Sequence, residues 1–468
     1  MPITSVNGPD TGPPRETWHD ALRAYRRKPV VAMLFLGFSS GLPFYLVFNT
    51  LSAWLRQAGI ARSTIGMLSW VGILFSIKYL WAPFVDRLPL PLLHRLLGRR
   101  RAWMLLAQIG IGVGLFYLSQ RDPAAGGVRA VALGALFVAF CAATQDIALD
   151  AWRIESGTAE TQGLMLSAYQ LGYRVALITG SAGALKLADG LGWHVSYATM
   201  ATLVSIGIVT TLLVPEPRPS ATKESVEREE RVIQWLETRA DWPPILLNAG
   251  EWVMTAVVCP LLDFFARFGP ILAVLTLLYI GSYRLTEYAM GSMANPFYID
   301  HGYKLSEVAR IVKVYGLTAS IAGVLLAGVA IPKIGLLRSL VAGSVLMILS
   351  NLGFSLLATS DTPTLVGLGA VNVLDNFAQA MQGIPLIVFM SGLTSPKYTA
   401  TQYALFSSFY SLPGKFLEGF SGFIVESIGY PSFFVYTASL SLIGLFMLYV
   451  LTRRGLTREG VLAHASGT

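Results

Sequence analysis

The feature that most constrains the fold is a series of apolar stretches, each long enough to cross a lipid bilayer. A membrane-spanning helix needs about 20 mostly apolar residues, and stretches of that order recur along most of the 468-residue chain. They begin near Val30, Thr64, Ala102, Val128, Gln162 and Trp193, and again near Pro270, Leu305, Ser339, Pro363, Tyr398 and Pro431. The pattern predicts an all-α polytopic membrane protein with twelve core transmembrane helices in two six-helix halves.

Composition excludes several other classes of protein. Charged residues make up 13% of the chain, whereas soluble globular proteins carry about 25%, so a soluble enzyme and a disordered scaffold are both excluded. The net charge of +8 is distributed over short clusters between apolar stretches, which does not predict a nucleic-acid partner. No GxxxxGK[ST] motif occurs, and the isolated Cys141 and Cys259 form no metal or disulfide motif. We therefore expect no catalytic residues, no cofactor and no metal.

Polar segments divide the chain into five parts. We expect a tail over residues 1–28, a six-helix bundle over 29–214, a linker over 215–269, a second bundle over 270–453 and a tail over 454–468. Basic residues cluster before the first stretch, between the second and third, and after the last. Basic loops mark the cytoplasmic side of a membrane protein, so both termini are expected in the cytoplasm. The linker is expected to hold a charged helix around residues 224–238.

Residues 244–269 interrupt the count of spans. The segment is apolar enough to touch a membrane but contains Asn248, Glu251, Asp263 and Arg267. A single crossing here would invert the second half and move its basic loops outside. We therefore expect an amphipathic helix at the membrane interface, although a re-entrant pair or two short extra spans would also preserve the orientation.

The last spans of the two halves carry similar polar residues in the same order. Span 4 contains Gln145 and Asp146, and span 10 contains Asp375. Span 5 contains Tyr173 and Arg174, and span 11 contains Tyr410 and Lys415. Duplicated six-span halves with a substrate site near the membrane midplane are the architecture of major facilitator transporters.

Charged side chains within membrane spans are costly, so they face an aqueous cavity or a partner. A carboxyl group in such a cavity can gain and lose a proton, and a cation there attracts an anionic substrate. The candidate proton-coupling residues are Asp146, Asp375, Asp150 and Glu287. The candidate substrate-binding residues are Arg174, Lys415, Tyr173, Gln145, Gln170, Tyr410, Lys78 and Arg284. Two of these groups have a purely structural alternative, because Asp150 can pair with Arg153, and Arg284 can pair with Glu287.

Three stretches resemble the AmpG-type muropeptide permeases of the major facilitator superfamily. They are Phe35–Phe44 (FLGFSSGLPF), Lys78–Trp103 and Thr144–Glu155 (TQDIALDAWRIE). The resemblance implies a major facilitator fold in the inner membrane of a Gram-negative bacterium. It also implies proton-driven import of anhydromuropeptides (GlcNAc-1,6-anhydro-MurNAc, with or without a stem peptide) for peptidoglycan recycling, which feeds β-lactamase induction and hence β-lactam resistance. The expected partners are this substrate, protons and membrane lipid, and the expected state is a monomer.

The loop between spans 2 and 3 is similar to a lengthened form of the superfamily's signature loop. Asp86 and Arg87 stand at one end of it, and Arg99 and Arg100 at the other. An acid at one helix end facing arginines at another can hold a cytoplasmic gate in one conformation. The same arginines also fit the simpler interpretation that they only set the orientation of the chain.

Two other functions remain open on the sequence. One is a carrier for a different organic anion, such as the acetyl-CoA-type transporters. The other is a receptor or channel for wall fragments that does not carry out coupled transport.

Overall fold

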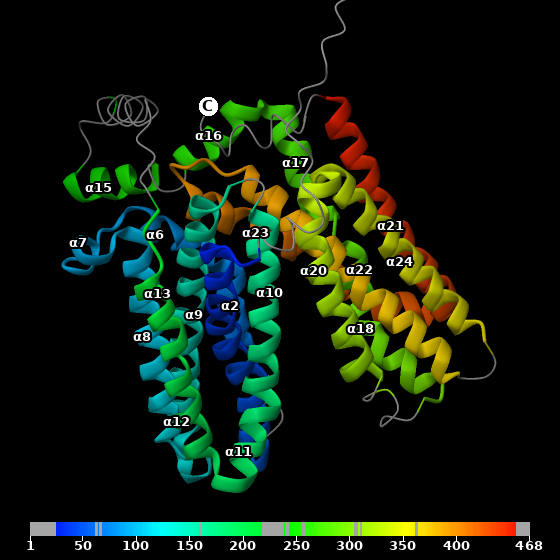
Figure 1. Ribbon diagram of the computed structural model, residues 1–468, viewed down its shortest axis with the longest axis horizontal. Helices are drawn as coiled ribbons and strands as arrows, with labels where there is room; N and C mark the ends of the chain where they lie inside the picture. The colour runs from blue at the N-terminus through cyan, green and yellow to red at the C-terminus, as the bar shows by residue number, and fades with distance from the viewer. Residues whose placement is uncertain are drawn as a thin grey trace, which may run out of the picture.

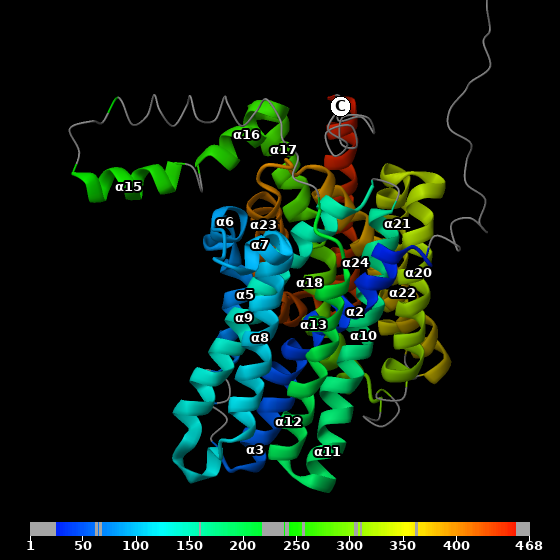
Figure 2. The same cartoon turned by 60° about the vertical axis from the view of Figure 1, so that its left-hand side comes forward.

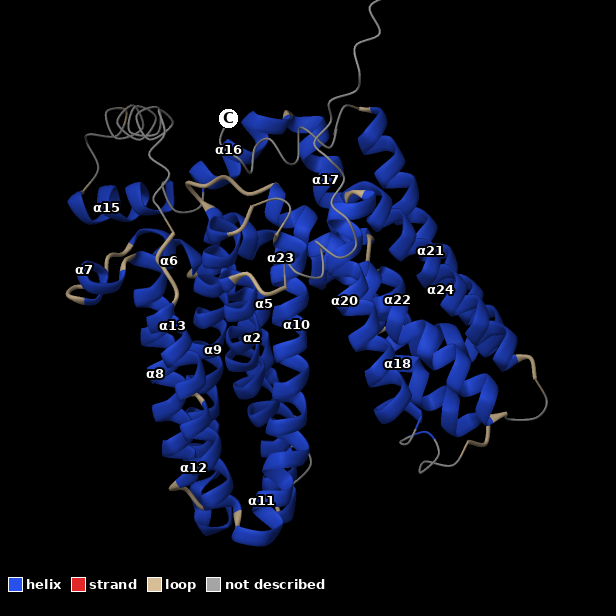
Figure 3. Cartoon of the chain, viewed as in Figure 1, coloured by secondary structure: helices blue, strands red, loops and turns tan. Residues whose placement is uncertain are grey.

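The computed structural model describes residues 25–60, 64, 68–158, 161–217, 238, 243–254, 258–303, 308, 311–360 and 364–454. Within these ranges every regular element is a helix (Figure 3). Nearly all of the two predicted tails and most of the predicted charged helix around residues 224–238 lie outside the described residues.

The N-terminal half consists of long helices joined by short turns. They are α2 (Lys28–Tyr45), which continues through a π-helical turn into α3 (Leu51–Gln57), α8 (Arg99–Ser119), α9 (Val128–Ser156), α10 (Gln162–Ile178), α11 (Ala184–Leu191), α12 (Trp193–Leu203) and α13 (Ser205–Leu213). The second predicted span is broken into α5 (Ile73–Ile77) and α6 (Ala82–Arg87), separated by a 3₁₀ turn, and α7 (Leu93–Leu97) follows. Pro83 in the first turn of α6 cannot donate to the preceding turn, which favours a break there.

The C-terminal half follows the same plan. Its helices are α17 (Pro270–Ser282), α18 (Leu285–Asp300), α20 (Leu317–Ile334), α21 (Leu336–Ala358), α22 (Leu365–Gly392), α23 (Thr399–Glu418) and α24 (Ser421–Arg453). Gly429 in α24 has a φ of 74° and is followed closely by Pro431, so this helix is kinked. A left-handed residue of this kind favours glycine.

The segment over residues 244–269 forms two short helices, α15 (Pro244–Val253) and α16 (Cys259–Phe268). Each has 10 residues and is about 15 Å long, too short to cross the hydrocarbon core. α15 lies across the end of the N-terminal half, beyond α6 and α7 (Figure 2), where Trp252 packs on Phe84 with ring centroids 4.8 Å apart.

Eight described helices are long and apolar enough to cross a membrane, or nine if the bent pair of α16 with α17–α18 counts as one span. The prediction of twelve is not reproduced by these criteria. One reason is that the second span is broken into short pieces. Another is that α10 and α23, the fifth and eleventh predicted spans, contain several polar residues, because they line the contact between the halves.

Glycines bring α2 and α10 into backbone contact. A Cβ atom on Gly172 would lie 1.8 Å from the carbonyl oxygen of Leu34, and one on Gly37 would lie 2.1 Å from that of Tyr169. Small residues allow such close approach of membrane helices. This packing fixes the rotation of α10 and therefore the direction of its polar residues.

The two halves meet at one end of the molecule and separate toward the other (Figure 1). The end where they meet holds α7, α15, α16 and the C-terminal end of α24. Hydrogen bonds across the boundary include Tyr25 Oη to the carbonyl oxygen of Leu325 (3.1 Å) and Ser167 Oγ to that of Val324 (2.8 Å). Arg174 and Lys415, two of the residues predicted to carry out transport, also form hydrogen bonds with the opposite half.

Candidate functional site

Asp146 lies on α9, where α2 and α10 converge. Its Oδ1 accepts a hydrogen bond of 2.5 Å from Ser40 Oγ, and Ser40 Oγ lies 2.8 Å from the hydroxyl of Tyr169. The neighbouring Gln145 is fully buried, and its Oε1 accepts from Ser39 Oγ at 3.3 Å. The FSSG sequence of α2 therefore supplies the hydroxyl groups that bind Gln145 and Asp146.

Asp375 occupies a comparable place on α22 in the other half. Its Oδ1 accepts from Ser350 Oγ at 2.9 Å, and its Oδ2 accepts from Gln379 Nε2 at 2.7 Å. The side chain is 5% exposed. Among the described residues, neither Asp146 nor Asp375 forms an ion pair.

The other two candidate acids are paired with cations. Asp150 lies 3.9 Å from Lys78 Nζ and 3.4 Å from Arg153 Nη2. Glu287 forms a two-point contact with Arg284, and Arg284 Nη1 also donates to the hydroxyl of Tyr410 at 3.0 Å. Both predicted local pairs are therefore present, because Asp150 contacts Arg153 and Arg284 contacts Glu287.

Arg174 and Lys415 reach across the boundary between the halves. Arg174 Nη2 on α10 donates to Ser320 Oγ on α20 at 2.9 Å. Lys415 Nζ on α23 donates to Ser76 Oγ on α5, also at 2.9 Å. In the part of the chain that the structure describes, neither cation has an acidic partner. Among the described candidate residues, each half therefore contributes one acid and one cation without an ion-pair partner.

Aromatic rings lie on the same helices as these cations. Tyr173 packs against Tyr45 with ring centroids 5.5 Å apart and against Tyr169 at 6.1 Å. Tyr410 lies 6.4 Å from Tyr288 in the other half of the site. Gln170 is half-buried on α10, one position from Tyr169.

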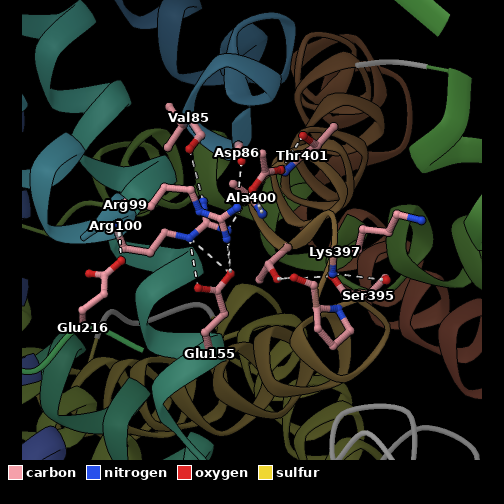
Figure 4. Close-up of polar contacts among 12 residues, drawn as sticks. Val85, Asp86, Arg99, Arg100, Glu155, Glu216, Ser395, Lys397, Ala400 and Thr401 are labelled. Carbon is pink, nitrogen blue, oxygen red and sulfur yellow. Dashed lines mark hydrogen bonds and ion pairs between the residues drawn. The ribbon is translucent and has the colours of Figure 1, made fainter. Parts of the chain in front are cut away.

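Asp86 lies at the end where the halves meet, and its carboxylate accepts four hydrogen bonds (Figure 4). One comes from Arg100 Nη2 at 2.8 Å within the N-terminal half. The others come from the opposite half: the amides of Ala400 (3.3 Å) and Thr401 (2.8 Å) and the Thr401 hydroxyl (2.6 Å). Since α23 begins at Thr399, Asp86 binds the positive end of a helix in the other half.

Further charges hold Asp86 in this position. Arg100 is 1% exposed and also binds Glu155, with Nε–Oε2 at 3.0 Å. Arg99 donates to the carbonyl oxygen of Asp86 at 2.9 Å, and the Arg87 guanidinium lies 5.9 Å from the centre of the Tyr398 ring. The structure therefore places all four candidate gating residues at one junction.

Several residues of this junction were not expected from the sequence. Gln402 joins α16 to the loop before α23: its amide donates to the carbonyl oxygen of Pro260 (2.8 Å) and to Asp263 (2.9 Å). Its Oε1 accepts from the amide of Ser395 (2.7 Å) and from Arg267 (3.1 Å). Arg153 crosses to Ser391 Oγ at 3.1 Å. The polar run TATQ at the start of α23 is the signal that could have pointed to this contact.

Comparison with known proteins identifies the family. The family model described as Major Facilitator Superfamily matches residues 33–417. An Escherichia coli protein named anhydromuropeptide permease is 33% identical over 431 residues, which cover 92% of this chain and 81% of the relative. The chain belongs to the AmpG-type permeases of the major facilitator superfamily. It is a multi-pass membrane transporter and not an enzyme.

Other relatives agree with this family. A Rickettsia felis protein named transporter AmpG 4 is 31% identical over 90% of this chain and 95% of its own length. Among solved structures, the transporter FucP in its outward conformation superposes with a TM-score of 0.65 at 13% identity, over 92% of this chain and 99% of FucP. The proton:xylose symporter XylE superposes with a TM-score of 0.61 at 12% identity, over 95% and 99%. These structures show the fold.

The Asp86 junction leads to a first prediction. Asp86→Ala removes the acceptor of four hydrogen bonds, three of them between the halves, so an AmpG-type permease with this change should open at this end. Spin labels can be placed at Leu96 and Arg453, which are both exposed. The ratio of the population at long distances to that at short distances between the two labels should rise at least tenfold. Thr401→Ala is the graded control, because it removes one hydroxyl and keeps both amides, and it should shift the ratio less than threefold. An unchanged distance distribution in Asp86→Ala would show that this contact does not hold the end closed.

Proposed function

We propose that this permease imports anhydromuropeptides (GlcNAc-1,6-anhydro-MurNAc, with or without a stem peptide) from periplasm to cytoplasm, driven by protons. It would lie in the bacterial inner membrane with both termini in the cytoplasm, act as a monomer and serve peptidoglycan recycling. Residues 29–214 and 270–453 would be the two moving units, joined by the 215–269 linker. The E. coli relative named for this substrate supports the proposal.

The observation that carries the proposal is the pair of cations, Arg174 and Lys415, without acidic partners among the described residues. Arg174 lies twelve residues into α10 and Lys415 sixteen residues into α23, about 18 and 24 Å along helices that start at the closed end. A cation at this depth is costly unless it meets an anion or water. The carboxylates of a lactyl group or stem peptide would supply that anion through charge-assisted hydrogen bonds.

The tyrosines around the cations suit the sugar part of such a substrate. Tyr45 on α2 and Tyr169 on α10 both pack against Tyr173, the neighbour of Arg174 in the sequence. Aromatic rings bind the apolar faces of sugars, while hydroxyl groups find hydrogen-bond partners. We assign Gln145, Gln170 and Tyr410 to the same site, and we assign Lys78 and Arg284 to positioning the acids beside it.

Protons would be carried by Asp146 and Asp375. A carboxylate that has only neutral hydrogen-bond donors loses less on protonation than one that is held by a cation. Asp150 and Glu287 are held by Lys78 and Arg284, so we assign them to tuning the first pair.

Uptake into vesicles tests this proposal. Vesicles containing the permease should accumulate radiolabelled anhydro-disaccharide under an inward proton gradient, and a protonophore should abolish the accumulation. Uptake that is unchanged by the protonophore would contradict proton coupling. Competition by coenzyme A esters but not by muropeptides would instead identify a carrier of another organic anion, and flux without saturation or counterflow would identify a channel.

A further inference from the structure

A groove runs between α2 and α13 on the surface of the N-terminal half. It has a volume of about 970 Å³. Val31, Ala32 and Phe35 line it from α2, and Ile206, Val209 and Leu213 line it from α13. Leu213 is 79% exposed, and Phe35 and Val209 are also exposed. From Lys28 to Phe35 the groove follows α2 for about 10 Å.

The packing of α13 explains why the groove exists. At Gly207 the two helices are in close contact, because a Cβ atom there would lie 2.1 Å from Ser39 Oγ. Beyond this point the end of α13 is held by other helices. Arg101 on α8 binds the carbonyl oxygens of Thr211 and Leu212, and Trp152 on α9 donates to that of Pro215 at 2.9 Å. The groove therefore opens from the crossing at Gly207 toward the end where the halves meet.

The mouth of the groove is cationic. Arg26 and Lys28 line it, together with Pro29 and Pro215, and no acidic residue is among its described lining residues. Both side chains are exposed, and neither forms an ion pair within the described part of the chain. An apolar groove below two cations is complementary to an anionic phospholipid, whose phosphate would lie at the mouth and whose acyl chain would lie along the groove.

We propose that this groove is a binding site for one anionic phospholipid. Its phosphate contacts Arg26 and Lys28, and one acyl chain lies between α2 and α13 as far as Phe35 and Ile206. The cytoplasmic leaflet supplies this lipid in the proposed orientation. Binding itself is independent of what the permease carries.

Native mass spectrometry of the full chain with equimolar phosphatidylglycerol and phosphatidylethanolamine tests the site. We expect one bound lipid with a strong preference for phosphatidylglycerol. The double variant Arg26→Gln/Lys28→Gln should lose most of that preference, by on the order of 30-fold at about 1 kcal/mol for each cation. Arg56→Gln/Arg129→Gln removes the same charge from exposed positions elsewhere on this half and should change nothing.

A second pair of variants tests the contribution of the apolar groove to lipid binding separately from that of the two cations. Val209→Trp should fill the groove and reduce bound lipid at least fivefold, whereas Val345→Trp, in a groove between α21 and α24, should not. A phosphatidylglycerol with a diazirine in its acyl chain should label peptides that contain Phe35 or Ile206. Equal binding of both lipids, a preference that survives Arg26→Gln/Lys28→Gln, or labelling confined to other helices would overturn the proposal.

Discussion

Asp146→Asn is expected to abolish proton-driven accumulation of substrate while leaving exchange of substrate across the membrane measurable. Asparagine keeps the size of the side chain and can still accept a hydrogen bond from Ser40, whose Oγ lies 2.5 Å from Asp146 Oδ1 in the wild-type protein. It cannot take up a proton. The variant should therefore still bind substrate and change between its two conformations, but a proton gradient would no longer drive the accumulation of substrate.

The size of this effect follows from the coupling. One proton moved down a gradient of one pH unit is worth about 1.4 kcal/mol, which corresponds to an accumulation of about tenfold for one proton per monoanionic substrate, because no net charge then crosses the membrane. We expect wild-type vesicles to approach such a ratio and Asp146→Asn to equilibrate near one. Radiolabel uptake at an imposed gradient measures the accumulation ratio, and counterflow with preloaded substrate measures the exchange of substrate across the membrane.

Two further variants make the result specific. Asp375→Asn should show the same loss if both unpaired acids carry protons, and normal accumulation if only Asp146 does. Glu216→Gln changes an acid outside the site, which binds the backbone amides of Arg100 and Arg101, and it should preserve coupling. Normal proton-driven uptake in Asp146→Asn would remove this residue from the mechanism.

The helical membrane fold could be predicted because it depends on local composition. Apolar stretches interrupted by basic loops are visible in the sequence, and the family model confirms the fold that they predicted. The break in the second span was harder to see. Its residues are apolar, and Pro83 alone does not show that the chain forms several short helical pieces between Ser69 and Arg87.

The candidate site was predictable in its residues but not in its pairings. The scarcity of charge singled out Asp146, Arg174, Asp375 and Lys415, and positions three apart on a helix suggested two local pairs. The partners of Asp86 lie more than 300 positions away in the sequence, at Ala400 and Thr401. Only the packing of one half on the other brings them together, as it does for Gln402 and α16.

Removing either unpaired cation should weaken substrate binding, most of all for substrates with a stem peptide. Arg174→Ala or Lys415→Ala removes a charged donor and also its serine contact in the opposite half, Ser320 or Ser76. A hydrogen bond to a charged group contributes about 1.5–3 kcal/mol, so we expect the affinity for the peptide-bearing substrate to fall roughly 10- to 150-fold.

The conservative variants distinguish a lost charge from a lost contact. Arg174→Gln and Lys415→Gln keep a neutral hydrogen-bond donor but remove the charge, so the substrate carboxylate loses its charged partner. Isothermal titration with the disaccharide and with its peptide-bearing form gives the two affinities for each variant. An Arg56→Ala control changes an exposed arginine at the end of α3 and should leave both affinities unchanged. An equal loss for the two ligands would assign the cations to the disaccharide part of the substrate, because the carboxylates of the stem peptide are absent from the disaccharide.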